Sequence, residues 1–363
     1  MNIKTVSILD AIALMIFAID LGTYFFEINF FLRYFPFLLG LNFIVFLATR
    51  SKDFIYLSIA LTIIFLCCMI WNQDTSLNIS SLLINLSLGL YLYLRIPNRK
   101  AISFLMVFFL MILTARVYIS FDDFEQILEG GSVNYVSIIA LSVCGLYYTF
   151  NSKKNAPVNI FPALLTCTLC VLTTGRSGSA TSIILLVGLF LYNYKFMKRK
   201  TLKNLSYIAI LLTTILVIVE YSDLLYAIDN PSSVFFRFGQ IYADEGRAII
   251  LIEYFNNFGF FDFLFGKGNV SMFEATGVSI HISYLQWHIS LGASAILIYV
   301  LVLFANFKLF LTNKLYWLIM TVLILRAATD HIMLTAGFIF GPLLIYFCAV
   351  VYHPYYLKFK TKI

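Results

Sequence analysis

The sequence predicts an all-α integral membrane protein with about twelve transmembrane helices and one large extracytoplasmic loop. Hydrophobic residues make up 61% of its 363 positions, whereas charged residues make up only 12%, about half of the share usual in soluble domains. Apolar runs close to the roughly 20 residues that a helix needs to cross a bilayer recur along the chain. These runs are continuous rather than alternating, so helices are expected and a β-barrel is not.

The apolar runs define the expected spans in chain order. We predict transmembrane helices at about 7–26, 34–49, 54–71, 79–95, 101–119, 133–150, 158–174, 178–194, 205–220, 283–305, 315–329 and 332–352. The first run is followed by no small-residue cleavage site, so we expect it to stay as a membrane helix. Together the spans form one polytopic domain over residues 1–363, and its single long connection covers residues 221–281.

Basic residues predict the orientation, because most of the 25 lysines and arginines cluster in alternate loops and at both ends of the chain. By the positive-inside rule these loops and both termini are cytoplasmic. The other basic residues then lie at or near the outer face: Arg33, Arg116, Arg176, Arg237, Arg247, Lys267 and Arg326.

The outer arginines suggest binding of a phosphate group, because a guanidinium pairs with phosphate through two parallel hydrogen bonds. The alternative is that they pair with acidic residues of the same face, notably Asp122, Asp123, Glu125, Asp244 and Glu245. The group from Asp122 to Glu125 is the only dense acidic one, and an acidic outer loop is its simpler interpretation. We therefore predict no metal site and no cofactor.

The long segment 221–281 is too rich in aromatic and branched residues to be disordered, as stretches 233–238 and 248–255 show. Asp244 and Glu245 precede an apolar periodic run and predict a helix start, and Gly266–Gly268 predicts a turn that ends the run. We expect short amphipathic helices that lie on the membrane surface or over the helix bundle.

Two strings resemble motifs of the bacterial O-antigen polymerase and ligase superfamily. Residues 173–179, TTGRSGS, place Arg176 in a polar hinge between two apolar spans. The second string runs from Gly246-Arg247 through an apolar helix and the glycine turn to His281-Ile-Ser-Tyr-Leu285, with Gly292 further on. This order is similar to the large periplasmic loop of that family. The resemblance covers about residues 173–303.

The resemblance implies a membrane glycosyltransferase with a GT-C-like fold in the bacterial inner membrane. It would join oligosaccharide repeat units linked through diphosphate to undecaprenol, by metal-independent, inverting transfer at the periplasmic face. It assigns Arg176, Arg247 and, less closely, Arg237 to the donor diphosphate, and His281 as the catalytic base for the acceptor hydroxyl. The implied partners are the lipid-linked donor and acceptor, membrane lipid and a chain-length regulator protein, with no nucleic acid.

Other polar residues near the second string have simpler interpretations. His281 and His288 are about 10 Å apart along a helix axis, too far to bind one metal ion, so His288 is expected to be structural. Arg326 and Asp330 stand four residues apart and predict a helical ion pair. Together with His331 they are the candidates for an acceptor site.

Two other functions remain open on the sequence alone. A ligase that transfers finished polymer to lipid A-core shares the donor and the chemistry. A lipid-linked oligosaccharide flippase or other transporter also suits twelve helices, and Asp10 and Asp20 in or near the first span could belong to a transport path. A transporter should carry charged residues inside the bundle and often an internal repeat, and no repeat is visible here.

Overall fold

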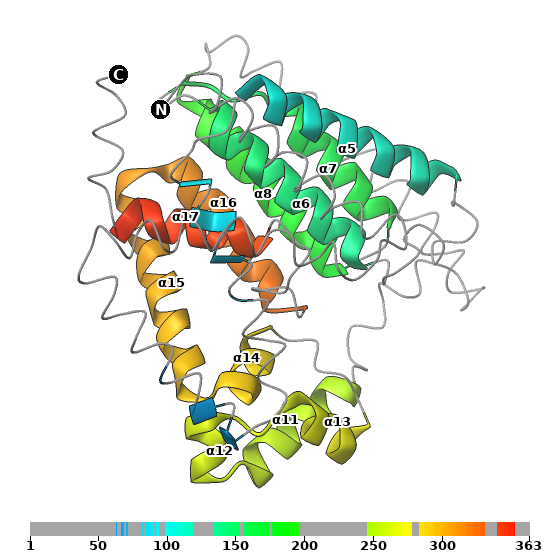
Figure 1. Ribbon diagram of the computed structural model, residues 1–363. Coiled ribbons are helices and arrows are strands. Elements are labelled where there is room, and N and C mark those ends of the chain that lie inside the picture. Colours follow the sequence, from blue (N-terminus) through cyan, green and yellow to red (C-terminus); the bar gives the residue numbers. More distant parts are fainter. Residues whose placement is uncertain are drawn as a thin grey trace, which may run out of the picture.

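All regular structure in the described residues is helical, with no strand among them. The computed structural model describes residues 99–119, 134–152, 156–173, 176–196, 245–277, 283–330 and 340–352, together with isolated positions between 63 and 93 (Figure 1). The helices are α5 (Arg99–Ile119), α6 (Asn134–Asn151), α7 (Phe161–Leu172), α8 (Arg176–Tyr194), α11 (Glu245–Asn257), α12 (Phe260–Phe265), α13 (Asn269–Thr276), α14 (Ser283–Leu291), α15 (Ala293–Thr312), α16 (Lys314–Ala327) and α17 (Phe340–Tyr352).

Two stretches, Ser177–Tyr194 in α8 and Ala293–Thr312 in α15, are long and apolar enough to cross a membrane. Met106–Ile119, Tyr135–Asn151, Phe161–Leu172 and Phe340–Tyr352 are shorter apolar stretches. The spans predicted before residue 63, and the one at 205–220, lie outside the part of the chain that the structure describes.

Helices α5 to α8 form an up-and-down bundle (Figure 1). Ser103 at the start of α5 donates a hydrogen bond to Asn151 at the end of α6, so these neighbours are antiparallel. The buried amide of Asn193, near the end of α8, accepts from the nitrogen of Val158 and donates to its carbonyl at 2.9 and 2.7 Å. It thereby fixes the chain just before α7 to the end of α8.

Helix α16 inserts between α6 and α8 through glycine contacts. A Cβ at Gly188 of α8 would lie 2.7 Å from Leu318 Cδ2, and one at Gly145 of α6 would lie 3.1 Å from Ile319 Cγ2. Glycine at these positions lets the helices approach closely, and α17 then covers α6, α15 and α16. The core formed in this way is mainly apolar, with buried polar side chains such as Ser142 and Thr149 in the same bundle.

The two ends of this bundle carry different basic residues. Lys195 lies 4.6 Å from the ring of Tyr192, and Lys314 lies 3.3 Å from the ring of Phe310. Because α8 and α16 are antiparallel, these two lysines belong to the same end of the bundle. Arg326 and the first residue of α8, Arg176, belong to the opposite end.

The predicted span 283–305 is wrong as a single helix, because Gly292 divides it into α14 and α15. Gly292 has a φ of 53°, and a Cβ there would lie 2.5 Å from the nitrogen of Phe265. The stretch long and apolar enough to cross a membrane is therefore α15, whose 20 residues extend about 30 Å. Helix α14 is a separate short helix at its N-terminal end.

The described part of the long segment, 245–277, contains the three short helices α11, α12 and α13. Helix α11 starts at Glu245, where the acidic residues predicted a start. The glycine turn Gly266–Gly268 separates α12 from α13, and both glycines have positive φ, 88° and 95°. Gly268 N donates a hydrogen bond of 3.0 Å to Ile289 O, so the turn is joined to α14 through the backbone.

Candidate functional site

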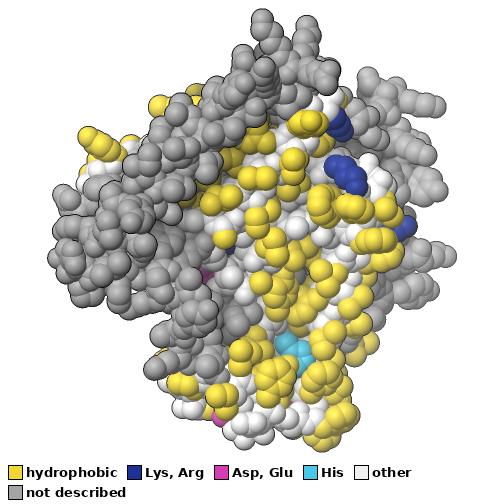
Figure 2. Space-filling view, turned by 180° about the vertical axis from the view of Figure 1, so that it is seen from behind, with side chains coloured by type: hydrophobic (Ala, Val, Ile, Leu, Met, Phe, Trp, Pro, Cys, Tyr) yellow, Lys and Arg dark blue, Asp and Glu magenta, His cyan; other side chains and the backbone are white. Residues whose placement is uncertain are grey.

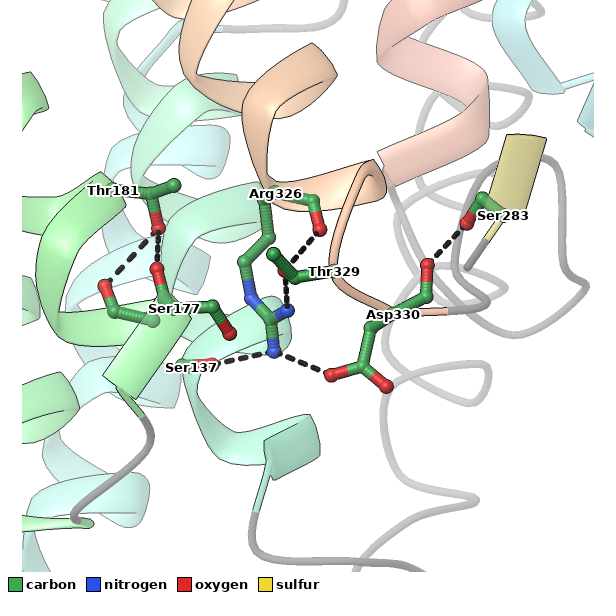
Figure 3. A network of polar contacts seen from close by, with 8 residues as sticks. Ser137, Ser177, Thr181, Ser283, Arg326, Thr329 and Asp330 are labelled. Atoms are coloured by element: carbon green, nitrogen blue, oxygen red, sulfur yellow. Dashed lines mark hydrogen bonds and ion pairs between the residues drawn. The ribbon is translucent and has the colours of Figure 1, made fainter. Parts of the chain in front are cut away.

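A buried arginine lies at the end of the bundle where α6, α8, α14 and α16 meet (Figure 3). Arg326 is 0% exposed, and its Nη2 donates to Asp330 Oδ2 at 2.9 Å and to Ser137 Oγ at 3.2 Å. Its Nη1 donates to Thr329 Oγ1 at 2.8 Å. The predicted ion pair between Arg326 and Asp330 is present, and the hydrogen bonds that Arg326 donates to Ser137 and Thr329 offset part of the cost of burying it.

Asp330 connects this arginine to the start of α14. Its carbonyl oxygen accepts from both the backbone nitrogen, at 3.2 Å, and the hydroxyl of Ser283, the first residue of α14. Tyr284 then donates through its hydroxyl to Ile324 O of α16 at 2.7 Å. The first turn of α14 is thus fixed to the end of α16 by three hydrogen bonds.

The string 173–179 lies against the same network. Thr173 is buried at the end of α7, and Ser179 Oγ donates to Cys170 O at 2.9 Å, which closes the turn between α7 and α8. A Cβ at Gly178 would lie 2.5 Å from Ser137 Oγ, the atom that accepts the hydrogen bond from Arg326. Glycine at position 178 therefore gives Ser137 the space in which it meets the arginine.

Figure 3 shows the guanidinium of Arg326 between Ser137 on one side and Asp330 on the other. Ser177 and Thr181 of α8 lie nearby and are linked by a hydrogen bond from Thr181 Oγ1 to Ser177 O of 2.7 Å. Sequence reasoning did not find Ser137, because a single serine in an apolar helix carries no signal of its distant partner.

The structure describes only some of the residues predicted to bind the donor diphosphate or to act as the catalytic base. Arg176 is the first residue of α8, and Arg247 lies in the first turn of α11, but their side chains are outside the described part of the chain. Arg237, His281 and His331 also lie outside it. The structure does describe their neighbours Ser283, two residues after His281, and Asp330, one residue before His331. The backbone nitrogen of Ser283 donates a hydrogen bond to the carbonyl oxygen of Asp330.

A second cluster joins α14 to the long segment through aromatic rings. His288 is buried, and its Nδ1 shares a hydrogen bond of 2.9 Å with the hydroxyl of Tyr254 in α11. The rings of Phe258 and Phe263 have centroids 5.8 and 5.0 Å from that of His288. These contacts agree with the structural role expected for this histidine.

The long segment also contains an ion pair of its own. Lys267, in the glycine turn, lies 3.2 Å from Glu253 Oε1, and Asn257 Nδ2 donates to Glu253 Oε2 at 2.6 Å. The hydrogen bond from Asn257 and the contact with Lys267 lower the pKa of Glu253 below its usual value. Of the basic residues expected at the outer face, Lys267 thus pairs with Glu253 and Arg326 with Asp330, the second as the spacing of four residues predicted.

Among the described residues no three His, Cys, Asp or Glu side chains gather closely enough to bind a metal ion. The acidic group from Asp122 to Glu125 lies outside them. Comparisons of the whole chain with models of known families, with curated proteins and with solved structures found no match.

Proposed function

We propose that this chain is a multi-pass membrane glycosyltransferase that polymerises oligosaccharide units carried on undecaprenyl diphosphate. The reaction takes place at the outer face of the bacterial inner membrane, and both termini lie in the cytoplasm. About twelve helices cross the bilayer, and the segment 221–281 lies on the outer side.

Membrane crossing is supported by α8 and α15, which have the length and composition for it. Helix α15 exposes the large apolar side chains Leu297, Leu301 and Phe304, and such a surface is unfavourable in water but suits lipid. Lys195 and Lys314 lie beside aromatic rings at one end of the bundle, as basic side chains do where a helix leaves the hydrocarbon.

The observation that carries the proposal is that the two family-like strings meet at one polar network. Gly178 of the first string contacts Ser137, which accepts from Arg326, and Arg326 pairs with Asp330. Asp330 in turn accepts from Ser283 of the second string. Two motifs that are about a hundred residues apart are thereby brought to the same end of the bundle, opposite the lysine-rich end.

In the proposed reaction the acceptor hydroxyl oxygen attacks the anomeric carbon of the donor sugar and His281 takes its proton. The bond between that carbon and the diphosphate oxygen breaks, and the configuration at the carbon inverts. Arg176 and Arg247, with Arg237, stabilise the charge that develops on the leaving diphosphate. Arg326 and Asp330 hold the helix that follows His281 in place, and with His331 they border the acceptor.

Deletion of the gene followed by gel analysis of surface polysaccharide tests the proposal. A single repeat unit on the core supports the polymerase. Bare core with accumulated lipid-linked polymer identifies a ligase instead, and bare core with unpolymerised units held inside identifies a flippase.

Complementation of that deletion with lysine variants tests the assigned roles of the arginines. Arg176→Lys and Arg247→Lys should restore little polymer, because a point charge cannot reproduce the two parallel hydrogen bonds of a guanidinium. Near wild-type polymer from normally expressed lysine variants contradicts the diphosphate assignment.

A further inference from the structure

The outer segment presents an apolar surface on the side that does not face the protein. In α11, Ile249, Ile252 and Phe255 follow one another at a spacing of three residues and are exposed, Phe255 to 76%. The other face of the same helix places Ile250 in a small core with Met272 and Ile289. A helix that is apolar on both faces needs an apolar medium or partner on its outer one.

Helix α12 extends this surface. None of its six residues is buried, and four of them are phenylalanines, with Phe260 exposed to 71%. Its only charged residue, Asp262, accepts a hydrogen bond from the backbone nitrogen of Gly259 at the start of the helix. Trp71 contacts Phe261 and Phe265 with ring centroids 5.4 and 6.2 Å apart, which leaves much of the aromatic surface uncovered.

The surface is continuous with that of α15, the helix that is long enough to cross a membrane. Helix α12 packs on both α14 and α15, and Leu264 lies directly against Gly292 at the start of α15. From there the exposed stripe runs along α15 through Leu297, Val300 and Leu301. Figure 2 shows hydrophobic side chains spread along this face of the molecule from the bundle to its far end.

We propose that the exposed apolar surface of α11 and α12 is seated in the outer leaflet and contacts the acyl chains of bilayer lipid. The inference rests on the membrane location in the proposed function, because the same hydrocarbon that surrounds α15 reaches its N-terminal end. The 20 residues of α15 span about 30 Å, close to the thickness of a bilayer core. Helix α12 therefore lies where that core meets the lipid headgroups, the depth at which apolar helix faces rich in phenylalanine insert.

This position fits the charges of the segment. Glu253 lies one helical turn after Ile249, beside the exposed stripe of α11, and its charge is paired with that of Lys267. The outer segment would thus be held at the level where the diphosphate of a lipid-linked substrate leaves the hydrocarbon. A protein partner would have to cover α15 as well, because the apolar surface does not end between α15 and α12.

Photo-crosslinking of the full-length protein in nanodiscs of bacterial phospholipid tests this placement. Benzoylphenylalanine, whose excited ketone inserts into aliphatic C–H bonds, replaces Phe255 or Phe260 in separate variants. Leu301, 52% exposed on α15, is the lipid-facing comparison, and Glu274, exposed on α13, is the polar control. We expect phospholipid adducts at positions 255 and 260 in yields comparable to that at 301 and several-fold above that at 274.

Yields at 255 and 260 as low as at Glu274 overturn the proposal. So do adducts to a second copy of the chain, or adducts that form only when lipid-linked donor is added. Hydroxyl-radical footprinting of the unmodified protein in nanodiscs gives an answer that requires no variant to fold: Phe255 and Phe260 should be as protected as Phe304, and rapid oxidation of them contradicts lipid contact. Neither readout requires catalysis, so a failed polymerase test leaves this result separately interpretable.

Discussion

The two ends of α14 are held by opposite kinds of chemistry. Its first turn is bonded by Ser283 and Tyr284 to the end of α16, where a buried ion pair completes the network. Its last turn is held mainly by aromatic rings packed around His288, one of which, Tyr254, also shares a hydrogen bond with it, and by backbone contacts to the glycine turn of the long segment. The first turn depends on every hydrogen-bond partner being present, whereas the last turn depends on how closely the neighbouring rings and backbone fit against it. The two should therefore respond differently to substitution.

The largest contrast is expected between two histidines of this region. His281→Ala should lower the rate of polymerisation by about 10²- to 10⁴-fold, the usual contribution of a general base. His288→Ala should stay within a few-fold of wild type, because its contacts are structural. The measurement is polymer formed per minute by purified protein on synthetic lipid-linked repeat units.

Both variants must first reach the membrane in normal amounts and still bind the lipid-linked donor. A His281→Ala protein that polymerises within a few-fold of wild type removes the base assignment. Asp330, His331 and the acidic residues of the loop expected outside are then the next candidates for the catalytic base.

At the polar end, Asp330→Ala should destabilise the fold by about 3–5 kcal/mol, because it leaves the charge of Arg326 buried without its carboxylate. The double variant Arg326→Met with Asp330→Ala should recover much of that loss, since no buried charge remains. Thermal unfolding of the purified variants in detergent measures both effects. Equal stability of the single and double variants would show that the pair is not the source of the cost.

At the other end of α14, Gly292→Ala tests how closely Gly292 packs against Leu264 and Phe265. The residue has positive φ, and the added methyl group would meet the backbone of Leu264 and Phe265. Gly277→Ala is a control for positive φ without contacts, because its φ of 68° imposes a left-handed penalty of about 1–2 kcal/mol but nothing lies within 4 Å. Gly292→Ala should lower the unfolding temperature clearly more than Gly277→Ala, and similar shifts would contradict the interlock.

The smallest effect is expected from the ion pair between Glu253 and Lys267 in the long segment. The pKa of Glu253 is lowered in the folded protein, so its stabilising contribution is complete above the usual value of 4.5 and is lost as pH falls through the lowered folded value. The unfolding temperature of wild type minus that of Glu253→Gln should therefore shrink on acidification below about pH 4.5. High salt should also reduce it, because the pair is partly exposed. A difference that does not change with pH would show that the carboxylate charge is not involved.

What could be predicted from sequence was local. The start of α11 at Glu245, the turn at Gly266–Gly268 and the pairing of Arg326 with Asp330 each depend on residues within four positions of one another. The long apolar stretch in α8, which could cross a membrane, follows from composition in the same way.

What could not be predicted depends on distant partners. An isolated glycine in a helical pattern does not predict a break. Gly292 ends α14 through its positive φ, and the backbone of Leu264 and Phe265 leaves no room for a side chain there. Ser137 gains its role from an arginine 189 positions later. The cluster of Tyr254 and His288 likewise joins two segments that the sequence leaves unconnected.

The separation between Ser137 and Arg326 has a consequence for biosynthesis. Helices α5 to α8 contact their sequence neighbours, so this part of the chain can assemble as soon as it leaves the ribosome. At the usual 5–20 residues per second, the 189 positions that follow Ser137 take about 10–40 s to synthesise before Arg326 exists. During that interval Ser137 cannot yet accept its hydrogen bond from Arg326. The arrival of α16 is then the step that completes the polar network around Ser137, before α17 covers α6, α15 and α16.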